Sequence, residues 1–235
     1  MKEEGKAILP TLIVDQLYSD LKERIIRGQL KPDEKLSVRT LCEYYKVSDT
    51  PVKQALNRLA AERFVDALPR RGMRVRCVSL KDIHEALEAR QMIELFAVPH
   101  AIRLAGEEPG FLEALEENLE KNRQLLEDLE SLSHYSEKAE QELAVSQDFH
   151  RILVKAVGNS VILDSYENIL AHQYVYYQHQ KDKRRELMAS LREHRQILDY
   201  LKAGDGAAVR EAIITHLRYR EEDVSAVMDS HAGRR

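Results

Sequence analysis

The sequence has no apolar run long enough to cross a membrane, since a spanning helix needs ~20 consecutive apolar residues and no run approaches that length. It has only two cysteines, Cys42 and Cys77, with neither a zinc-ligand nor a redox spacing between them. This argues against a disulfide framework and is typical of a reduced, intracellular protein. The spacing His-Glu-x-x-His, which would indicate a metalloprotease, is also absent.

The N-terminal apolar patch around Ile13 has acidic residues on both sides and no small-residue cleavage site after it. This is not the pattern of a secretory signal peptide, and we expect a cytoplasmic protein. Hydrophobic residues make up 43% of the chain and charged residues 32%, a composition that supports a packed core and does not indicate disorder. With 235 residues, the chain has room for two domains.

The charge is unevenly distributed along the chain. Residues 1–77 carry 16 Lys+Arg against 11 Asp+Glu, a net of +5, and the remainder carries 20 against 29, a net of −9. A basic N-terminal part (the head, residues 1–77) joined to an acidic remainder (the body) is the pattern expected when only the head binds nucleic acid.

The first 78 residues predict three helices followed by two strands. Apolar residues recur at helical spacing from Pro10 to a stop at Gly28, and Ser48 or Asp49 can cap the third helix. After that helix the period changes to two, with a basic turn over residues 69–72 between the strands. The expected elements are helices over 10–28, 38–45 and 50–62, and strands over 64–68 and 73–78. This order predicts a winged helix-turn-helix.

From Leu80 onward the pattern is helical, with breaks at Gly106, Pro109, the pair Gly158 and Asn159, and residues 204–206. The expected helices cover residues 80–105, 109–131, 136–157, 160–181, 184–203 and 205–225. We therefore predict a mainly α protein with two domains: a winged helix-turn-helix over residues 10–78 and an antiparallel helical bundle over residues 79–228.

The head resembles the GntR family of bacterial transcription regulators. The residues that carry the resemblance are Gly28, Leu30 and Pro32 in the first turn, the run from Val47 to Leu56 in the third helix, and Pro69 to Gly72 in the wing. The body resembles the ligand-sensing FCD domain of the same family, in its fatty-acid-regulator-like branch. There the carrying features are Arg90 to Glu94, Phe149 and His150 before Gly158, Glu193 and His194 before Gly204, and then His216.

The resemblance implies a sequence-specific regulator that binds double-stranded operator DNA as a homodimer. It places a set of head residues on the DNA, although any one of the cations could instead be an ordinary solvated side chain. The implied DNA-binding residues are Arg39, Ser48, Thr50, Lys53, Arg70, Arg71 and Gly72.

Two positions depart from the family pattern in the third helix. Asp49 stands where the family usually has a DNA-binding arginine, and Lys53 stands where it usually has another. Asp49 should weaken phosphate binding or shift base preference, since a carboxylate can accept from a cytosine amino group. Lys53 keeps the charge but loses the bidentate fork of arginine.

The resemblance also implies a metal site, because His150, His194 and His216 match three metal-ligand positions of metal-binding family members. Neutral imidazoles suit a divalent ion such as Zn²⁺ or Ni²⁺. The family's fourth ligand, an aspartate, is replaced by Ser146. Asp148 should point to a different face, whereas Glu142, two turns before His150, is a possible substitute.

The effector implied by the family is a small molecule, expected here to be an organic acid. Arg90 is a candidate clamp for its carboxylate, with an ion pair to Glu94 as the alternative. Tyr174 and Tyr177 are candidates for an aromatic wall, with core packing as the alternative.

Three other functions would each fit part of the sequence. They are a metal-free regulator of the same family, a metalloenzyme with three histidines, and a DNA-binding protein without an effector. No general base stands at a motif spacing, so we do not expect an enzyme. We expect no membrane partner.

Overall fold

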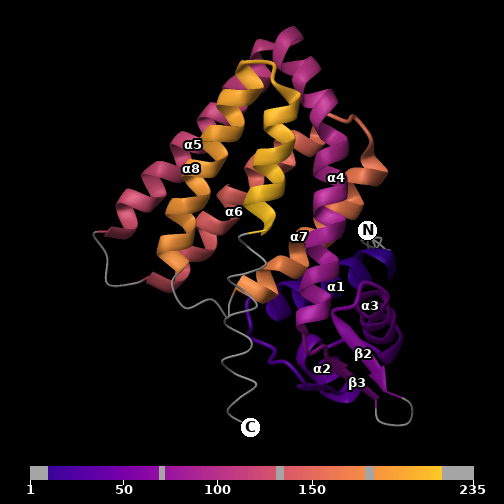
Figure 1. Ribbon diagram of the computed structural model, residues 1–235. Coiled ribbons are helices and arrows are strands. Elements are labelled where there is room, and N and C mark those ends of the chain that lie inside the picture. The colour runs from indigo at the N-terminus through magenta and orange to yellow at the C-terminus, as the bar shows by residue number, and fades with distance from the viewer. Residues whose placement is uncertain (1–9, 69–71, 131–134, 178–182, 219–235) are drawn as a thin grey trace, which may run out of the picture. The chain divides into compact units, whose positions relative to one another are not determined.

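The computed structural model describes residues 10–68, 72–130, 135–177 and 183–218, and divides into two compact units, Met1–Ser79 and Leu80–Arg235 (Figure 1). The first unit combines helices with a small sheet, and the second is helical wherever it is described. No helix among the described residues is long and apolar enough to cross a membrane. The predicted fold class is confirmed.

The first unit contains three helices: α1 (Pro10–Ile26), α2 (Val38–Tyr45) and α3 (Asp49–Ala61). The hydroxyl of Ser37 caps α2 by accepting from the backbone N–H of Thr40 at 3.4 Å, and Lys46 ends it with a positive φ of 55°. Packing of α1 against α3 buries a continuous apolar stripe. Its buried members are Leu17, Leu21, Ile25, Val52, Ala55, Leu56 and Leu59.

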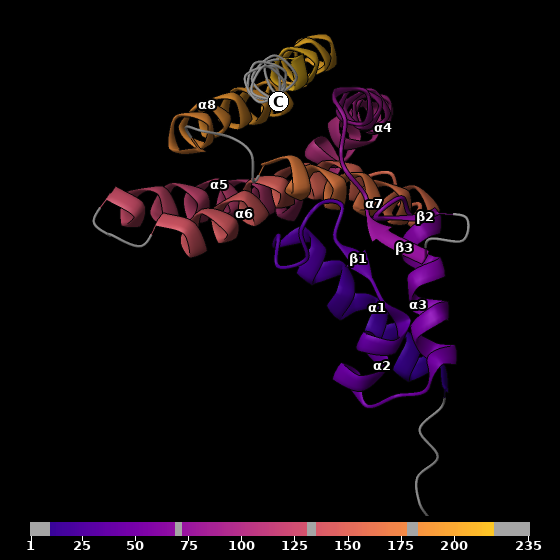
Figure 2. The same ribbon diagram turned by 90° about the horizontal axis from the view of Figure 1, so that it is seen from below.

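The sheet consists of β1 (Lys35–Leu36), β2 (Val65–Leu68) and β3 (Gly72–Val75), in the antiparallel order β1-β3-β2 (Figure 2). The β2–β3 hairpin confirms the predicted wing. The sequence did not predict β1, because two residues are too few to show a period of two. Leu36 is nevertheless buried, opposite Met73 in the sheet register.

The second unit contains α4 (Leu80–Glu107), α5 (Pro109–Glu130), α6 (Tyr135–Lys155), α7 (Ser160–Tyr177) and α8 (Lys183–Lys202), followed by a helix over residues 206–218. In Figure 1 this last helix is the unlabelled yellow ribbon beside α8. α5 packs against α6 and α8, while α4 packs against α6 and α7. Where the structure describes their ends, the predicted helices agree with these to within a few residues. Residues 178–181 and 219–225 of the predicted helices lie outside the described residues.

Glycine–Asx pairs separate the helices that carry the site. Gly158 and Gly204 both adopt a φ of 69°, a conformation that a side chain would strain. The next residue then caps the following helix: the Asn159 side chain accepts from the N–H of Val161 at 2.9 Å, and that of Asp205 accepts from Ala208 at 3.0 Å. These breaks turn the chain back into the bundle at the points that the sequence predicted.

Candidate metal centre and DNA-binding residues

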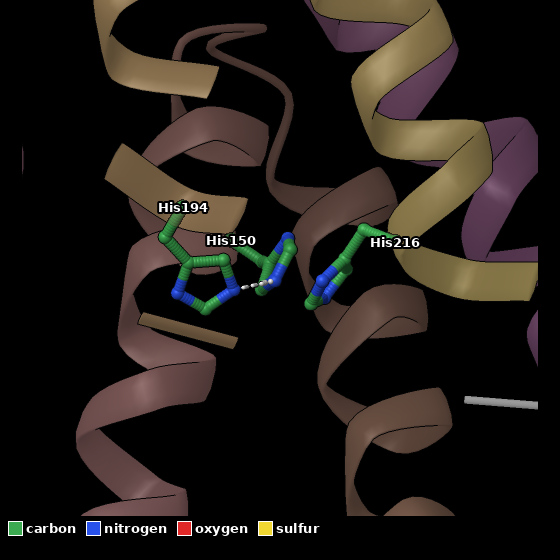
Figure 3. A group of neighbouring side chains, drawn as sticks. All are labelled: His150, His194 and His216. Atoms are coloured by element: carbon green, nitrogen blue, oxygen red, sulfur yellow. Dashed lines mark hydrogen bonds between the residues drawn. The ribbon is translucent and has the colours of Figure 1, made fainter. Parts of the chain in front are cut away.

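Three histidines from three helices meet in the interior of the bundle (Figure 3). His150 lies on α6, His194 on α8 and His216 on the last helix, and their exposed fractions are 1%, 0% and 2%. One candidate ligand atom from each residue lies within 4.8 Å of the others, and the Nε2 atoms of His150 and His194 are 2.8 Å apart. The three positions named by the sequence therefore form one cluster.

Helical spacing explains why these rings face inward. α6 carries Ser146 four residues before His150, and α8 carries Ser190 four residues before His194, so that each serine and histidine share a helix face. Both serines are buried, and their hydroxyl oxygens lie 3.3 Å apart. Phe149 stacks on the His194 ring at a centroid distance of 4.5 Å and an interplanar angle of 4°.

Two carboxylates hold the outer nitrogens of this cluster. Glu94 Oε2, from α4, lies 2.9 Å from Nδ1 of His150, and Glu193 Oε2, from α8, lies 2.6 Å from Nδ1 of His216. A carboxylate can only accept, so Nδ1 is the donor in both pairs. Each bond leaves the ring's Nε2 with the lone pair that a metal ion requires.

Both carboxylate oxygens of Glu94 accept hydrogen bonds from buried side chains. Its Oε1 accepts from the Nε of Arg90 and from the hydroxyl of Tyr166, the latter at 2.6 Å. Burial alone would raise the pKa of Glu94, but the Arg90 guanidinium, His150 and the hydrogen bonds together hold that pKa well below its usual range. Glu94 is therefore an ionised carboxylate in the core, 1% exposed.

The donor set fits a divalent ion. Three buried imidazoles converge, and carboxylates on two of them are the outer-shell arrangement typical of histidine-bound metals. The pair of Ser146 and Ser190 adjoins His194, whose Nε2 lies 3.3 Å from the hydroxyl oxygen of Ser190. Ser146 supplies a neutral hydroxyl at the position where the family resemblance implies an anionic ligand.

Of the two other carboxylates considered for the fourth ligand position, Asp148 does not supply it. Asp148 turns away from the cluster and pairs with Arg151 at 2.6 Å, as its position two residues before His150 predicts. The side chain of Glu142 lies outside the described residues.

Among the candidate effector residues, Arg90 is only 4% exposed and forms the ion pair with Glu94. Its geometry favours the ion-pair alternative over a carboxylate clamp. Tyr174 and Tyr177 lie on α7, but their side chains are outside the described residues.

The candidate DNA-binding residues that the structure describes are exposed. Ser48 takes the N-cap position of α3, but its side chain makes no capping hydrogen bond. Thr50 follows on the first turn, and Lys53 lies one turn further.

Arg39 projects from the start of α2, with 90% of its side chain exposed, and pairs with Glu43 at 3.0 Å. Gly72 begins β3 with a φ of 86°, whereas Arg70 and Arg71 lie outside the described residues.

Asp49 forms an ion pair with Lys53 on α3, at 2.6 Å. The hydrogen bond and charge of Lys53 lower the pKa of Asp49, and the same pair raises the pKa of Lys53. The departure from the family pattern thus neutralises a cation on the helix expected to enter the DNA groove.

Sequence reasoning missed the polar residues around the histidines. Tyr166 and Ser190 were not singled out, and Glu94 and Glu193 entered through the family resemblance, with Glu94 also as a partner for Arg90 but neither as a partner of a histidine. One signal was available: the Ser-x-x-x-His spacing occurs twice, in α6 and in α8. The contacts of Glu94 with His150 and Tyr166 join residues 56 and 72 positions apart, which no local pattern reveals.

Comparison with known proteins agrees with this architecture. The profile of the "bacterial regulatory proteins, gntR family" matches residues 13–75, and that of the FCD domain matches residues 85–219. The HTH-type transcriptional regulator YdhC of Bacillus subtilis is 27% identical over 97% of both chains. The HTH-type transcriptional repressor GlaR of Escherichia coli is 31% identical over 67% of this chain and 70% of its own. The solved structure of E. coli McbR/YncC is 24% identical, covers 91% of this chain and 97% of its own, and has a TM-score of 0.72.

A helix-turn-helix head with a helical body, matched over its length by such proteins, defines a DNA-binding transcriptional regulator rather than an enzyme. The chain belongs to the GntR family and carries its FCD domain.

Proposed function

We propose that this regulator binds a specific operator as a homodimer in the cytoplasm, and that a small organic acid held beside a divalent ion in the FCD domain controls its affinity for DNA. The observation that carries the sensor half is the buried cluster of His150, His194 and His216, with carboxylates on two of its Nδ1 atoms. Zn²⁺ or Ni²⁺ would be held by these three imidazoles and would supply a Lewis-acidic position for an oxygen ligand.

The charges around the cluster favour an anionic effector. Glu94 is offset by Arg90, and the only other carboxylate described on the cluster is Glu193, which is partly exposed. Among the described side chains, a divalent ion would therefore leave excess positive charge, because Ser146 and Ser190 are neutral. A carboxylate group on the effector would neutralise that excess.

Unpaired amides support a polar effector within the same bundle. Asn122 is 1% exposed, and neither polar atom of its side chain has a hydrogen-bond partner among the described residues. The Oδ1 of Asn118, one turn earlier on α5, and the Oε1 of Gln147 on α6 are also buried without one. Buried polar groups normally have partners, so these amides are suited to hydroxyl or carboxyl groups of a bound ligand.

Selection of DNA from a random duplex library by the full-length protein tests the operator half. We expect enrichment of a sequence with two related half-sites, since a two-fold protein normally reads a two-fold site. Repeating the selection with candidate organic acids, with and without zinc, should change the amount of DNA retained. Binding that shows no sequence preference at moderate salt would contradict the proposal.

Lys53→Ala is expected to weaken operator binding. If Lys53 contacts a phosphate, the slope of log affinity against log salt should fall by ~0.9, the value for one phosphate contact. Arg27→Ala is the matched control, because Arg27 forms the same kind of exposed i,i+4 ion pair, with Glu23 on α1. Electrophoretic mobility shifts at several salt concentrations measure both variants. Equal losses for the two would indicate a general charge effect. The corresponding expectation for Arg71→Ala concerns a residue outside the described part of the wing.

Asp49→Arg is expected to increase affinity for random duplex DNA. The substitution removes an anion, releases Lys53 from its ion pair and adds a cation on the helix expected to face DNA. Fluorescence anisotropy with a nonspecific duplex at low salt measures the effect, and Glu23→Arg on α1 gives the control for net charge. If Asp49→Arg binds no more tightly than Glu23→Arg, Asp49 does not face the DNA backbone.

A further inference from the structure

Two of the three clustered histidines donate Nδ1–H to a carboxylate, and the two carboxylates come from different parts of the bundle. Glu94 reaches His150 from α4, a helix that contributes no histidine to the cluster. Glu193 reaches His216 from α8, where it directly precedes His194. In both pairs the carboxylate thus comes from a different helix than the ring that it orients.

We infer that Glu94 and Glu193 are positioning residues that fix His150 and His216 as Nδ1–H tautomers and aim both Nε2 lone pairs at the centre of the cluster. What those lone pairs bind rests on the proposed function, whereas the tautomers themselves do not. A free imidazole exchanges between two tautomers, and only one of them presents a lone pair at Nε2. A carboxylate on Nδ1 selects that tautomer and makes the ring a stronger ligand.

The two carboxylates act from different surroundings. Glu94 is buried, and its rotamer is constrained because the oxygen that does not bond His150 accepts from Arg90 and Tyr166. The side chain of Glu193 is 25% exposed, so this carboxylate is less deeply buried than that of Glu94. Because Glu193 and His194 are adjacent on α8, a shift of α8 would move one ligand and the support of another together.

Ring ¹⁵N shifts of histidine-labelled, full-length protein without metal report the tautomers directly. The resonances are assigned by single histidine substitutions. We expect His150 and His216 to show a protonated Nδ1 and a bare Nε2. Zinc affinity is then measured by competition with a chelator of known strength.

The decisive variants are Glu193→Ala and Glu193→Gln. Alanine removes the acceptor, so we expect His216 to lose its fixed tautomer, His150 to keep its own, and zinc affinity to fall about 10- to 100-fold. Glutamine keeps an acceptor oxygen but not the charge, and should restore the tautomer with an intermediate affinity. Glu167→Ala is the control, because Glu167 is a bundle carboxylate on α7 that pairs with Arg151 at 2.8 Å.

For Glu94, the double variant Arg90→Met with Glu94→Leu removes both buried charges together and, unlike glutamine, leaves no acceptor for Nδ1 of His150. We expect this variant to change the tautomer population of His150 and to leave that of His216 unaltered. A bare Nδ1 on His150 or His216 in the wild type would overturn the inference. So would unchanged tautomer and zinc affinity in Glu193→Ala. Fixed tautomers in a wild-type protein that takes up no zinc would support the positioning role and contradict the metal proposal.

Discussion

His194→Ala is expected to abolish stoichiometric binding of zinc or nickel by the full-length protein. The variant leaves two imidazoles, and the carboxylates described near the cluster are already engaged: Asp148 by Arg151, and Glu94 and Glu193 by the Nδ1 atoms of the remaining histidines. Loss of a direct ligand should exceed the about 100-fold fall in affinity that loss of an outer-shell partner brings. Metal content after purification without an affinity tag or chelator, and again after loading and dialysis, measures the effect.

His100→Ala is the control for this experiment. His100 lies on α4, where its ring packs on that of Phe96 with a centroid distance of 5.3 Å and takes no part in the cluster. Its substitution should leave the metal content unchanged. A wild-type protein that takes up neither zinc nor nickel would rule out the metal site and leave a metal-free regulator, in which the three histidines bind the effector themselves. Ser146 in place of the family aspartate is the feature that favours that alternative.

The metal ligands could be predicted from the sequence, but their surroundings could not. Family resemblance named His150, His194 and His216, and helical spacing placed them on separate helices. The bond from His150 to Glu94 depends on how α4 packs against α6, which amphipathic patterns do not specify. The same limit applies to Arg90, for which the sequence left an effector clamp and an ion pair equally open.

In the head, periodicity was sufficient for elements with several turns or several alternating residues. The bounds Val38–Tyr45 of α2 agree with the prediction, and α3 begins one residue early, at Asp49. Strand β1 was missed because two residues pair through long-range contact with β3. Ser48 takes the N-cap position of α3, as its residue type predicted, but its side chain makes no capping bond. Residue type indicates that a cap is possible, and the local rotamer decides whether it forms.

Arg90→Met alone is expected to destabilise the FCD domain by about 3–5 kcal/mol, the usual effect of breaking a buried ion pair from one side. The substitution leaves the Glu94 carboxylate buried without its guanidinium, so that burial dominates and the pKa of Glu94 rises. Hydrogen exchange of the α4, α6 and α8 amides, followed by mass spectrometry, reports this domain separately from the head.

The double variant Arg90→Met with Glu94→Gln separates the charge effect from lost packing. It removes both charges, and we expect it to recover part of the stability lost in Arg90→Met, giving a favourable coupling energy in a double-mutant cycle. Additive losses would mean that the two side chains stabilise the core independently.

Acid should reproduce the loss of the Glu94 charge in the wild type. The folded pKa of Glu94 is depressed below its unfolded value, so its contribution to stability is complete above 4.5, the ordinary pKa of a glutamate side chain, and is lost as the pH falls below it. In Arg90→Met the raised pKa moves protonation of Glu94 to higher pH. Exchange protection of α4 in this variant should therefore depend on pH above 4.5, where this carboxylate gives the wild type no such dependence. A flat and equal profile for both proteins over that range would show that Arg90 does not set the ionisation of Glu94.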